Sequence, residues 1–181
     1  MGTIMKPTKH GLHMYVDADF AGNWDAIEAP NDRDTSRSRH GYIITYAGCP
    51  IVWKSQLQTE ISLSTTESEY TGLSHSLREA IPIMELLNEM KKYNFPISDK
   101  TPRVRCRVFE DNSGAIEIST THKYRPRTKY LNNKLHQFRD YVMRKEIEIL
   151  PVRSENQQAD YLTKAVTYPV LKHLRLKTTG W

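Results

Sequence analysis

Four acidic residues have the types and the spacing of a divalent-metal site: Asp17, Glu69, Asp111 and Asp160. Asp17 and Asp111 each follow a run of alternating apolar residues, which places them at the ends of predicted strands. Glu69 and Asp160 fall in the first turns of predicted helices. Carboxylates from two strand ends and two helix starts can converge on one site, and oxygen ligands of this kind suit Mg²⁺ or Mn²⁺ better than zinc.

The predicted helix starts help to assign the acids. Residues 64–67 (STTE) fit a capping box, in which Glu67 reaches back to the backbone amide of Ser64. Glu69 lies nearer the apolar stripe of the helix, so its carboxylate is aimed at the sheet and it is the predicted ligand. Residues 154–157 (SENQ) fit a second capping box. Asp160 follows it beside an apolar face, where a carboxylate needs a cation.

The elements that must position these acids follow from hydrophobic periodicity. The first half of the chain predicts a strand over 12–19, a polar connection over 20–40, and a hairpin of 41–47 and 51–57 across residues 48–50. A further pleated stretch is predicted through Ile61 and Leu63. Helical spacing then runs from Tyr70 to Leu87, and Pro82 within it predicts a kink or two abutting helices.

The second half of the chain predicts, in order, a strand over 103–110, a short helix from Ser113, a helix over 128–144, a strand over 146–152 and a helix over 155–166. Three antiparallel strands followed by alternating helices and strands predict an α/β fold with a five-stranded mixed sheet flanked by helices.

The length of 181 residues suits one domain with a hydrophobic core. We expect a flexible leader over 1–10, the domain over 11–166, and a basic C-terminal tail over 167–181 that is helical and packs on the domain. No apolar run approaches the roughly 20 residues that span a bilayer, so no membrane partner is predicted. Cys49 and Cys106 lie in strand-like contexts, which predicts buried reduced thiols.

Positive charge is concentrated in one segment of the chain. Residues 121–145 hold eight Lys or Arg against a single acid, Asp140. Such a segment beside an acidic cluster suits a polyanion that passes metal ions. The alternative is a solvated helix face, and the charge pattern alone does not choose between them.

Five strings carry a family resemblance: YVDADFAGN, IVWKSQLQTEISLSTTESEYTGLS, EDNSGAIEIS, RTKYLN and QQADYLTKAV. In this order they resemble the RNase H domain at the C-terminal end of copia-type (Pseudoviridae) LTR retrotransposon polyproteins. The resemblance extends from about Gly11 to the tail YPVLKHLRLKTTGW.

The resemblance implies an RNase H-like fold and endonucleolytic cleavage of the RNA strand of RNA/DNA hybrids during reverse transcription, leaving a 3′-hydroxyl and a 5′-phosphate. It implies two Mg²⁺ ions ~4 Å apart, replaceable by Mn²⁺. By analogy, Asp17 bridges both ions, Asp160 completes the water-activating site, and Glu69 with Asp111 holds the second ion. The implied partners are the hybrid and the reverse transcriptase polymerase domain of the same polyprotein. The implied location is a cytoplasmic virus-like particle.

The resemblance also suggests substrate-binding residues. Asn23 is a candidate reader of RNA 2′-hydroxyls, although a turn residue is an equal alternative. Thr66 and Asn112 are weaker candidates, because both also suit helix starts. The basic candidates are Lys123, Arg125, Arg127 and Lys129.

Two features depart from related enzymes. The loop 152–158 lacks the His that many cellular and retroviral RNases H carry before the last catalytic Asp, and His136 is the nearest replacement in the sequence, with a helix-surface role as the alternative. The connection 24–39 is long and charged, which suits either a substrate-contacting flap or a surface loop.

Two other functions compete with the hydrolase interpretation. An integrase shares the fold class, but its third acid is a late Glu and only three acids are expected. The stronger alternative is a catalytically weak RNase H-fold module that binds nucleic acid or tethers a reverse transcriptase.

Overall fold

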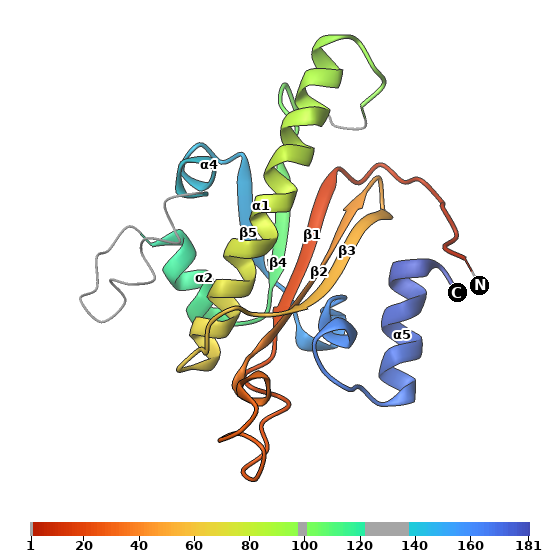
Figure 1. Cartoon of the computed structure of the whole chain (residues 1–181). Coiled ribbons are helices and arrows are strands. Elements are labelled where there is room, and N and C mark those ends of the chain that lie inside the picture. The colour runs from red at the N-terminus through yellow and green to blue at the C-terminus, as the bar shows by residue number, and fades with distance from the viewer. Residues whose placement is uncertain (1, 98–100, 122–137) are drawn as a thin grey trace.

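A five-stranded mixed sheet forms the centre of the molecule in the computed structural model, which describes residues 2–97, 101–121 and 138–181 (Figure 1). The strands are β1 Leu12–Ala18, β2 Arg39–Tyr46, β3 Cys49–Leu57, β4 Cys106–Glu110 and β5 Ile147–Pro151. Their order is β3-β2-β1-β4-β5, with antiparallel pairing from β1 to β3 and parallel pairing of β4 with β1 and β5. The predicted α/β fold with three antiparallel strands first is confirmed.

Helices cover the sheet. The described α-helices are α1 Thr65–Lys92, α2 Ser113–Thr120, α4 Arg139–Met143 and α5 Tyr168–Thr179, and the 3-10 turns are η1 Arg33–Ser36, η3 Ser154–Asn156 and η4 Asp160–Leu162. The long α1 crosses the sheet and contacts β1 and β2, while α5 contacts β3 (Figure 1). No helix in the described part of the chain combines the length and the apolar character needed to cross a membrane.

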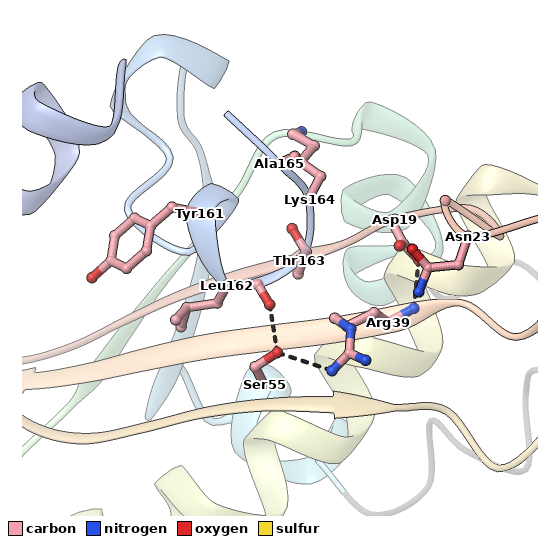
Figure 2. Close-up of a pocket in the computed structure, with 10 residues that line it drawn as sticks. Asp19, Asn23, Arg39, Ser55, Tyr161, Leu162, Thr163, Lys164 and Ala165 are labelled. Atoms are coloured by element: carbon pink, nitrogen blue, oxygen red, sulfur yellow. Dashed lines mark hydrogen bonds between the residues drawn. The ribbon is translucent and has the colours of Figure 1, made fainter. Parts of the chain in front are cut away.

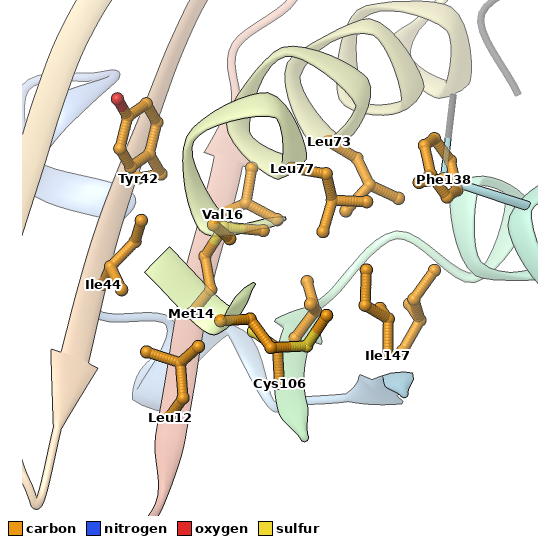
Figure 3. Close-up of a cluster of buried hydrophobic side chains, with 14 of the residues drawn as sticks. Leu12, Met14, Val16, Tyr42, Ile44, Leu73, Leu77, Cys106, Phe138 and Ile147 are labelled. Carbon is orange, nitrogen blue, oxygen red and sulfur yellow. The ribbon is translucent and has the colours of Figure 1, made fainter. Parts of the chain in front are cut away.

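The core lies between α1 and the sheet (Figure 3). Leu12 and Met14 of β1 are fully buried, as are Leu73 and Leu77 of α1. Each such side chain contributes about 1.5–3 kcal/mol when it leaves water. Cys106 is buried in the same core, and both cysteines are buried and free, as predicted.

The hairpin turn has two residues, 47 and 48, where three residues, 48–50, were predicted. Ala47 and Gly48 form the turn with φ of 53° and 76°, and Cys49 and Pro50 already belong to β3. Two consecutive positive φ angles match the twist of a hairpin. Pro50 is tolerated because β3 is an edge strand.

Three other predicted elements need correction. Ile61 and Leu63 are exposed outside any strand, so the pleated extension is wrong. The expectation of two abutting helices is also wrong, because α1 continues through Pro82, whose side chain is exposed. β4 begins at Cys106 and not at 103, because the backbone amide of Val104 donates to Asn88 Oδ1 of α1 at 2.7 Å.

The predicted helix over 155–166 is absent and is replaced by η3 and η4. Side-chain hydrogen bonds that tie this segment to the sheet take the place of a helical ladder. Of the helix predicted over 128–144, only α4 lies within the described residues. The leader is hydrogen-bonded through Ile4 N to Thr179 O of α5 and through Thr8 N to Ala47 O.

Candidate active site

Three of the four predicted acids converge. Asp17 lies near the end of β1, Glu69 in the first turns of α1, and Asp111 directly after β4. One carboxylate oxygen from each lies within 4.8 Å of the others. Asp17 and Glu69 are 2% and 5% exposed, and Asp111 is half-buried. The group therefore offers hard oxygen donors at the edge of the core, which fits a magnesium or manganese ion.

Asp160 lies beside this group, in η4. It is 7% exposed, and its Oδ1 atom lies 2.5 Å from Lys164 Nζ. The hydroxyl of Thr163 hydrogen-bonds to the backbone oxygen of Asp160 at 2.9 Å and to the carboxylate of Asp17. The fourth acid is thus joined to the first through Thr163, while its own carboxylate is paired with an ammonium.

Burial makes the negative charges costly. It raises the pKa of Asp17 to about 6, although the hydrogen bond from Thr163 and the charge of Lys164 lower it. Burial, followed by the charges of nearby carboxylates, raises the pKa of Glu69 well above its ordinary value. For Lys164, burial lowers the pKa, but the hydrogen bond and charges of the surrounding acids raise it overall. A divalent cation would relieve the same repulsion.

Glu110 is a fifth acid at this site that the sequence analysis missed. Its side chain is fully buried, its Oε1 atom accepts from Asn112 N at 3.1 Å, and its Oε2 atom has no hydrogen-bond partner among the described residues. Burial raises its pKa well above the ordinary value. The alternation of side chains along β4 could have predicted this burial, because Glu110 faces the same side of the sheet as the buried Cys106 and Val108.

Glu69 is positioned by β1 and by close packing of α1. Its Oε2 atom accepts from the backbone amide of Ala18 at 2.7 Å. A Cβ atom on Gly72 would lie 3.0 Å from His40 Cβ, so a glycine here lets α1 approach the sheet. Ser64 caps α1 by accepting from Glu67 N at 3.1 Å. Glu67 Oε2 accepts from Leu63 N at 2.9 Å, one residue before the Ser64 amide that the capping box predicted.

The segment 154–162, on both sides of Asp160, is attached by side-chain hydrogen bonds to the sheet and to Asp111 after β4. Ser154 Oγ donates to Asp111 Oδ2 at 2.8 Å, so the predicted second capping box is wrong and this hydroxyl contacts a candidate ligand instead. Gln157 is fully buried, and its Nε2 atom donates to Val16 O of β1 at 2.8 Å. Ser55 Oγ donates to Leu162 O at 2.5 Å.

The predicted substrate residues have different settings. Asn112 Oδ1 caps α2 by accepting from Ala115 N at 3.0 Å, which is the helix-start role. Thr66 lies at the junction of α1 and α2, where a Cβ atom on Gly114 would be 2.8 Å from its Oγ1 atom. Asn23 is exposed and lines a cavity beside the acids. The basic candidates and His136 lie outside the described residues: Lys123, Arg125, Arg127 and Lys129.

The connection 24–39 contains the 3-10 turn η1, and its last residue is held by Asp19. A carboxylate oxygen of Asp19 accepts from the backbone amide of Arg39. Asp19 therefore closes the loop between β1 and β2, two residues beyond the converging acid Asp17.

Comparisons with known proteins agree with this fold. The sequence is 33% identical over 155 residues to a "Retrovirus-related Pol polyprotein from transposon TNT 1-94" of Nicotiana tabacum, covering 86% of this chain and 10% of the relative. It is 30% identical over 174 residues to the corresponding polyprotein from transposon RE1 of Arabidopsis thaliana, covering 96% and 11%. The chain therefore spans about a tenth of the length of these relatives. No family model matches the chain.

Solved structures show the same fold at low sequence identity. The N-terminal RNase H domain of rv2228c from Mycobacterium tuberculosis, solved as a fusion with maltose binding protein, has a TM-score of 0.54 and 14% identity, covering 84% of this chain and 90% of that one. RNase H1 from Halobacterium salinarum has a TM-score of 0.50 and 16% identity, covering 85% and 95%. The chain thus belongs with the Pol polyproteins of copia-type transposons, as a segment that has the RNase H fold.

Proposed function

We propose that this chain is a metal-dependent endoribonuclease that hydrolyses the RNA strand of RNA/DNA hybrids during reverse transcription. The observation that supports it is the convergence of Asp17, Glu69 and Asp111 within 4.8 Å, on a fold shared with RNase H domains. In the reaction, a water oxygen bonds to phosphorus and loses a proton. The bond from phosphorus to the 3′-oxygen breaks, that oxygen takes up a proton from solvent and leaves as a 3′-hydroxyl, and the proton released by the attacking water goes to solvent while the phosphate stays on the 5′-oxygen.

Asp17, Glu69, Asp111 and Asp160 would hold the Mg²⁺ or Mn²⁺ ions. When bound, these ions supply charge for the attacking and leaving oxygens. Thr163 orients the Asp17 carboxylate, and Ser154 orients that of Asp111. Ala18 N fixes one oxygen of Glu69. Lys164 pairs with Oδ1 of Asp160, and the other oxygen of that carboxylate would be available to an ion.

The decisive experiment is cleavage of end-labelled RNA annealed to DNA, with Mg²⁺ and then Mn²⁺. The intact chain is compared with Asp111→Asn and with Asp140→Asn, which alters an exposed carboxylate of α4 outside the site. We expect metal-dependent cutting of the hybrid but not of single-stranded RNA, loss of at least a hundredfold in Asp111→Asn, and unchanged cutting in the control. Equal rates in Asp111→Asn and the intact chain would overturn the proposal.

One observation favours the alternative of a weakly catalytic binding module: the Asp160 carboxylate is already paired with Lys164. Tight, salt-sensitive hybrid binding without cutting would support that alternative. The polymerase domain of a longer Pol polyprotein is then the proposed partner, and a cytoplasmic virus-like particle is the proposed location for either function.

A further inference from the structure

A cavity of about 350 Å³ lies beside the acidic group (Figure 2). Its walls are the loop after β1, the start of β2, Ser55 of β3 and the segment around η4. Its polar lining includes Asn23, Arg39, Ser55, Thr163 and Lys164. Thr163 connects the cavity with the acidic group, because it lines the cavity and hydrogen-bonds to Asp17. The cavity is therefore adjacent to the candidate metal site.

Arg39 is the cation of the lining whose guanidinium contacts Ser55. Its side chain is half-buried, and its Nη1 atom donates to Ser55 Oγ at 3.2 Å. The Ser55 hydroxyl donates its hydrogen bond to Leu162 O, so towards Arg39 it is only an acceptor. Among the described residues, no carboxylate lies within ion-pair distance of this guanidinium. A half-buried planar fork of donors at the wall of a cavity suits a phosphate oxygen pair.

The acid in the cavity offsets part of this charge, because Asp19 interacts electrostatically with Arg39 and Lys164. Asp19 is the one acidic residue of the lining, and one of its oxygens accepts from the backbone amide of Arg39. Lys164 adds a second positive charge on the wall nearest Asp160. Figure 2 shows Arg39 between Ser55 and Asn23, with Thr163 and Lys164 on the opposite wall. The lining thus carries two cations and one acid, and because Lys164 is already paired with Asp160, Arg39 is the better placed of the two cations to bind an anion.

We propose that this cavity binds a non-scissile backbone phosphate of the nucleic acid, with Arg39 as its principal contact and Asn23 beside it. The inference rests on the proposed function for the identity of the polymer. Occupation of the cavity would fix the position of the strand relative to the acids, since one phosphate is held by Arg39 while another is presented to Asp17 and its neighbours. Arg39 is therefore a positioning residue.

The test measures binding and not cutting. Hybrids that carry one neutral methylphosphonate linkage, moved along the RNA strand and then along the DNA strand, are titrated against chains that all carry Asp111→Asn. With Arg39 present, we expect one linkage to weaken binding by about tenfold. In Arg39→Met that linkage should make no difference, and the slope of log K against log salt should fall by about 0.9. The strand that contains the sensitive linkage identifies the source of the phosphate.

Two variants control for charge and folding. Arg103 lies before β4, outside the cavity lining, and is an exposed cation that pairs with Glu146. In Arg103→Met, the same linkage should still weaken binding. Arg39→Lys keeps the charge without the fork and should retain part of the sensitivity, with a melting temperature close to that of the parent. Competition by inorganic phosphate at millimolar concentration, lost in Arg39→Met, would further support the site.

The outcomes separate this inference from the proposed function. If the intact chain cuts hybrids but Arg39→Met keeps the same sensitive linkage, the subsite is overturned and the nuclease remains. If no chain cuts but one linkage depends on Arg39, the subsite stands and the nuclease does not. Uniform weakening at every linkage in Arg39→Met would reduce Arg39 to a general electrostatic contribution and overturn the inference.

Discussion

The hydroxyl of Thr163 donates a hydrogen bond to a carboxylate oxygen of Asp17, across 146 positions of sequence. The same hydroxyl lies 2.9 Å from the backbone oxygen of Asp160. A single buried side chain thus orients one candidate ligand and contacts the backbone of another.

Thr163→Val removes this donor while keeping the shape of the side chain. Because groups that orient metal ligands contribute 10- to 100-fold to metal affinity, we expect Mg²⁺ and Mn²⁺ binding to weaken by about tenfold or more. Titration calorimetry measures the change. Thr163→Ser restores the hydroxyl and should recover most of the affinity, whereas wild-type affinity in Thr163→Val would disprove the orienting role.

The stability of the metal-free protein should depend on pH through Asp17. Its pKa is raised from 3.8 to about 6 in the folded state, so folding favours the protonated form. The contribution of Asp17 is fully present below pH 3.8 and is lost as the pH rises through 6. Asp17 alone should lower the free energy of unfolding by roughly 3 kcal/mol between about pH 4 and 7.

Urea unfolding of the intact chain and of Asp17→Asn checks this dependence, since the amide cannot titrate. The variant should gain stability relative to the intact chain as the pH rises, and saturating Mg²⁺ should reduce the difference. A constant difference from pH 4 to 7 would show that Asp17 titrates normally.

Gln157→Leu should destabilise the protein. The fully buried amide donates to Val16 O of β1 at 2.8 Å, and its loss leaves that carbonyl without this donor in the core. We expect a cost of about 1–3 kcal/mol in the free energy of unfolding. Gln158→Leu, at a half-buried neighbour, is the matched control and should cost less. Equal stabilities of the two variants would contradict the assignment.

Gly41→Ala should displace the segment that carries Asp160. A Cβ atom at Gly41 would lie 2.7 Å from Leu162 Cβ, so either η4 or β2 must shift. Overpacking of this kind costs about 1–3 kcal/mol, and metal affinity should fall with it. Gly2→Ala has open space around the new methyl group and serves as the control. Unchanged calorimetric titration of Gly41→Ala with Mn²⁺ would show that η4 tolerates the shift.

The strands and α1 were predictable because their periodicity is local. Alternation in β1 and helical spacing from Tyr70 to Leu87 record which side chains face the core. The segment 152–163 was predicted wrongly because its conformation depends on distant partners. Ser154 has the sequence setting of a helix cap, but its hydroxyl bonds to Asp111 instead. No local pattern contains that contact.

The candidate site was predictable in its acids and less so in their surroundings. Asp17, Glu69 and Asp111 converge as their placement on strand ends and a helix start suggested. Thr163 and Arg39 were missed because neither has a distinctive local setting. Their positions follow from the approach of η4 to β2, which is a tertiary contact.

The position of β1 in the middle of the sheet has a consequence for biosynthesis. Its antiparallel neighbour β2 follows soon after it in the chain, but its parallel neighbour β4 is made only after α1. A growing chain that has reached the end of β3 contains one of the four acids, and it gains the last only with η4. No partly synthesised chain ending before residue 160 can assemble the four-acid site, so the proposed nuclease activity would require almost the whole domain to be made.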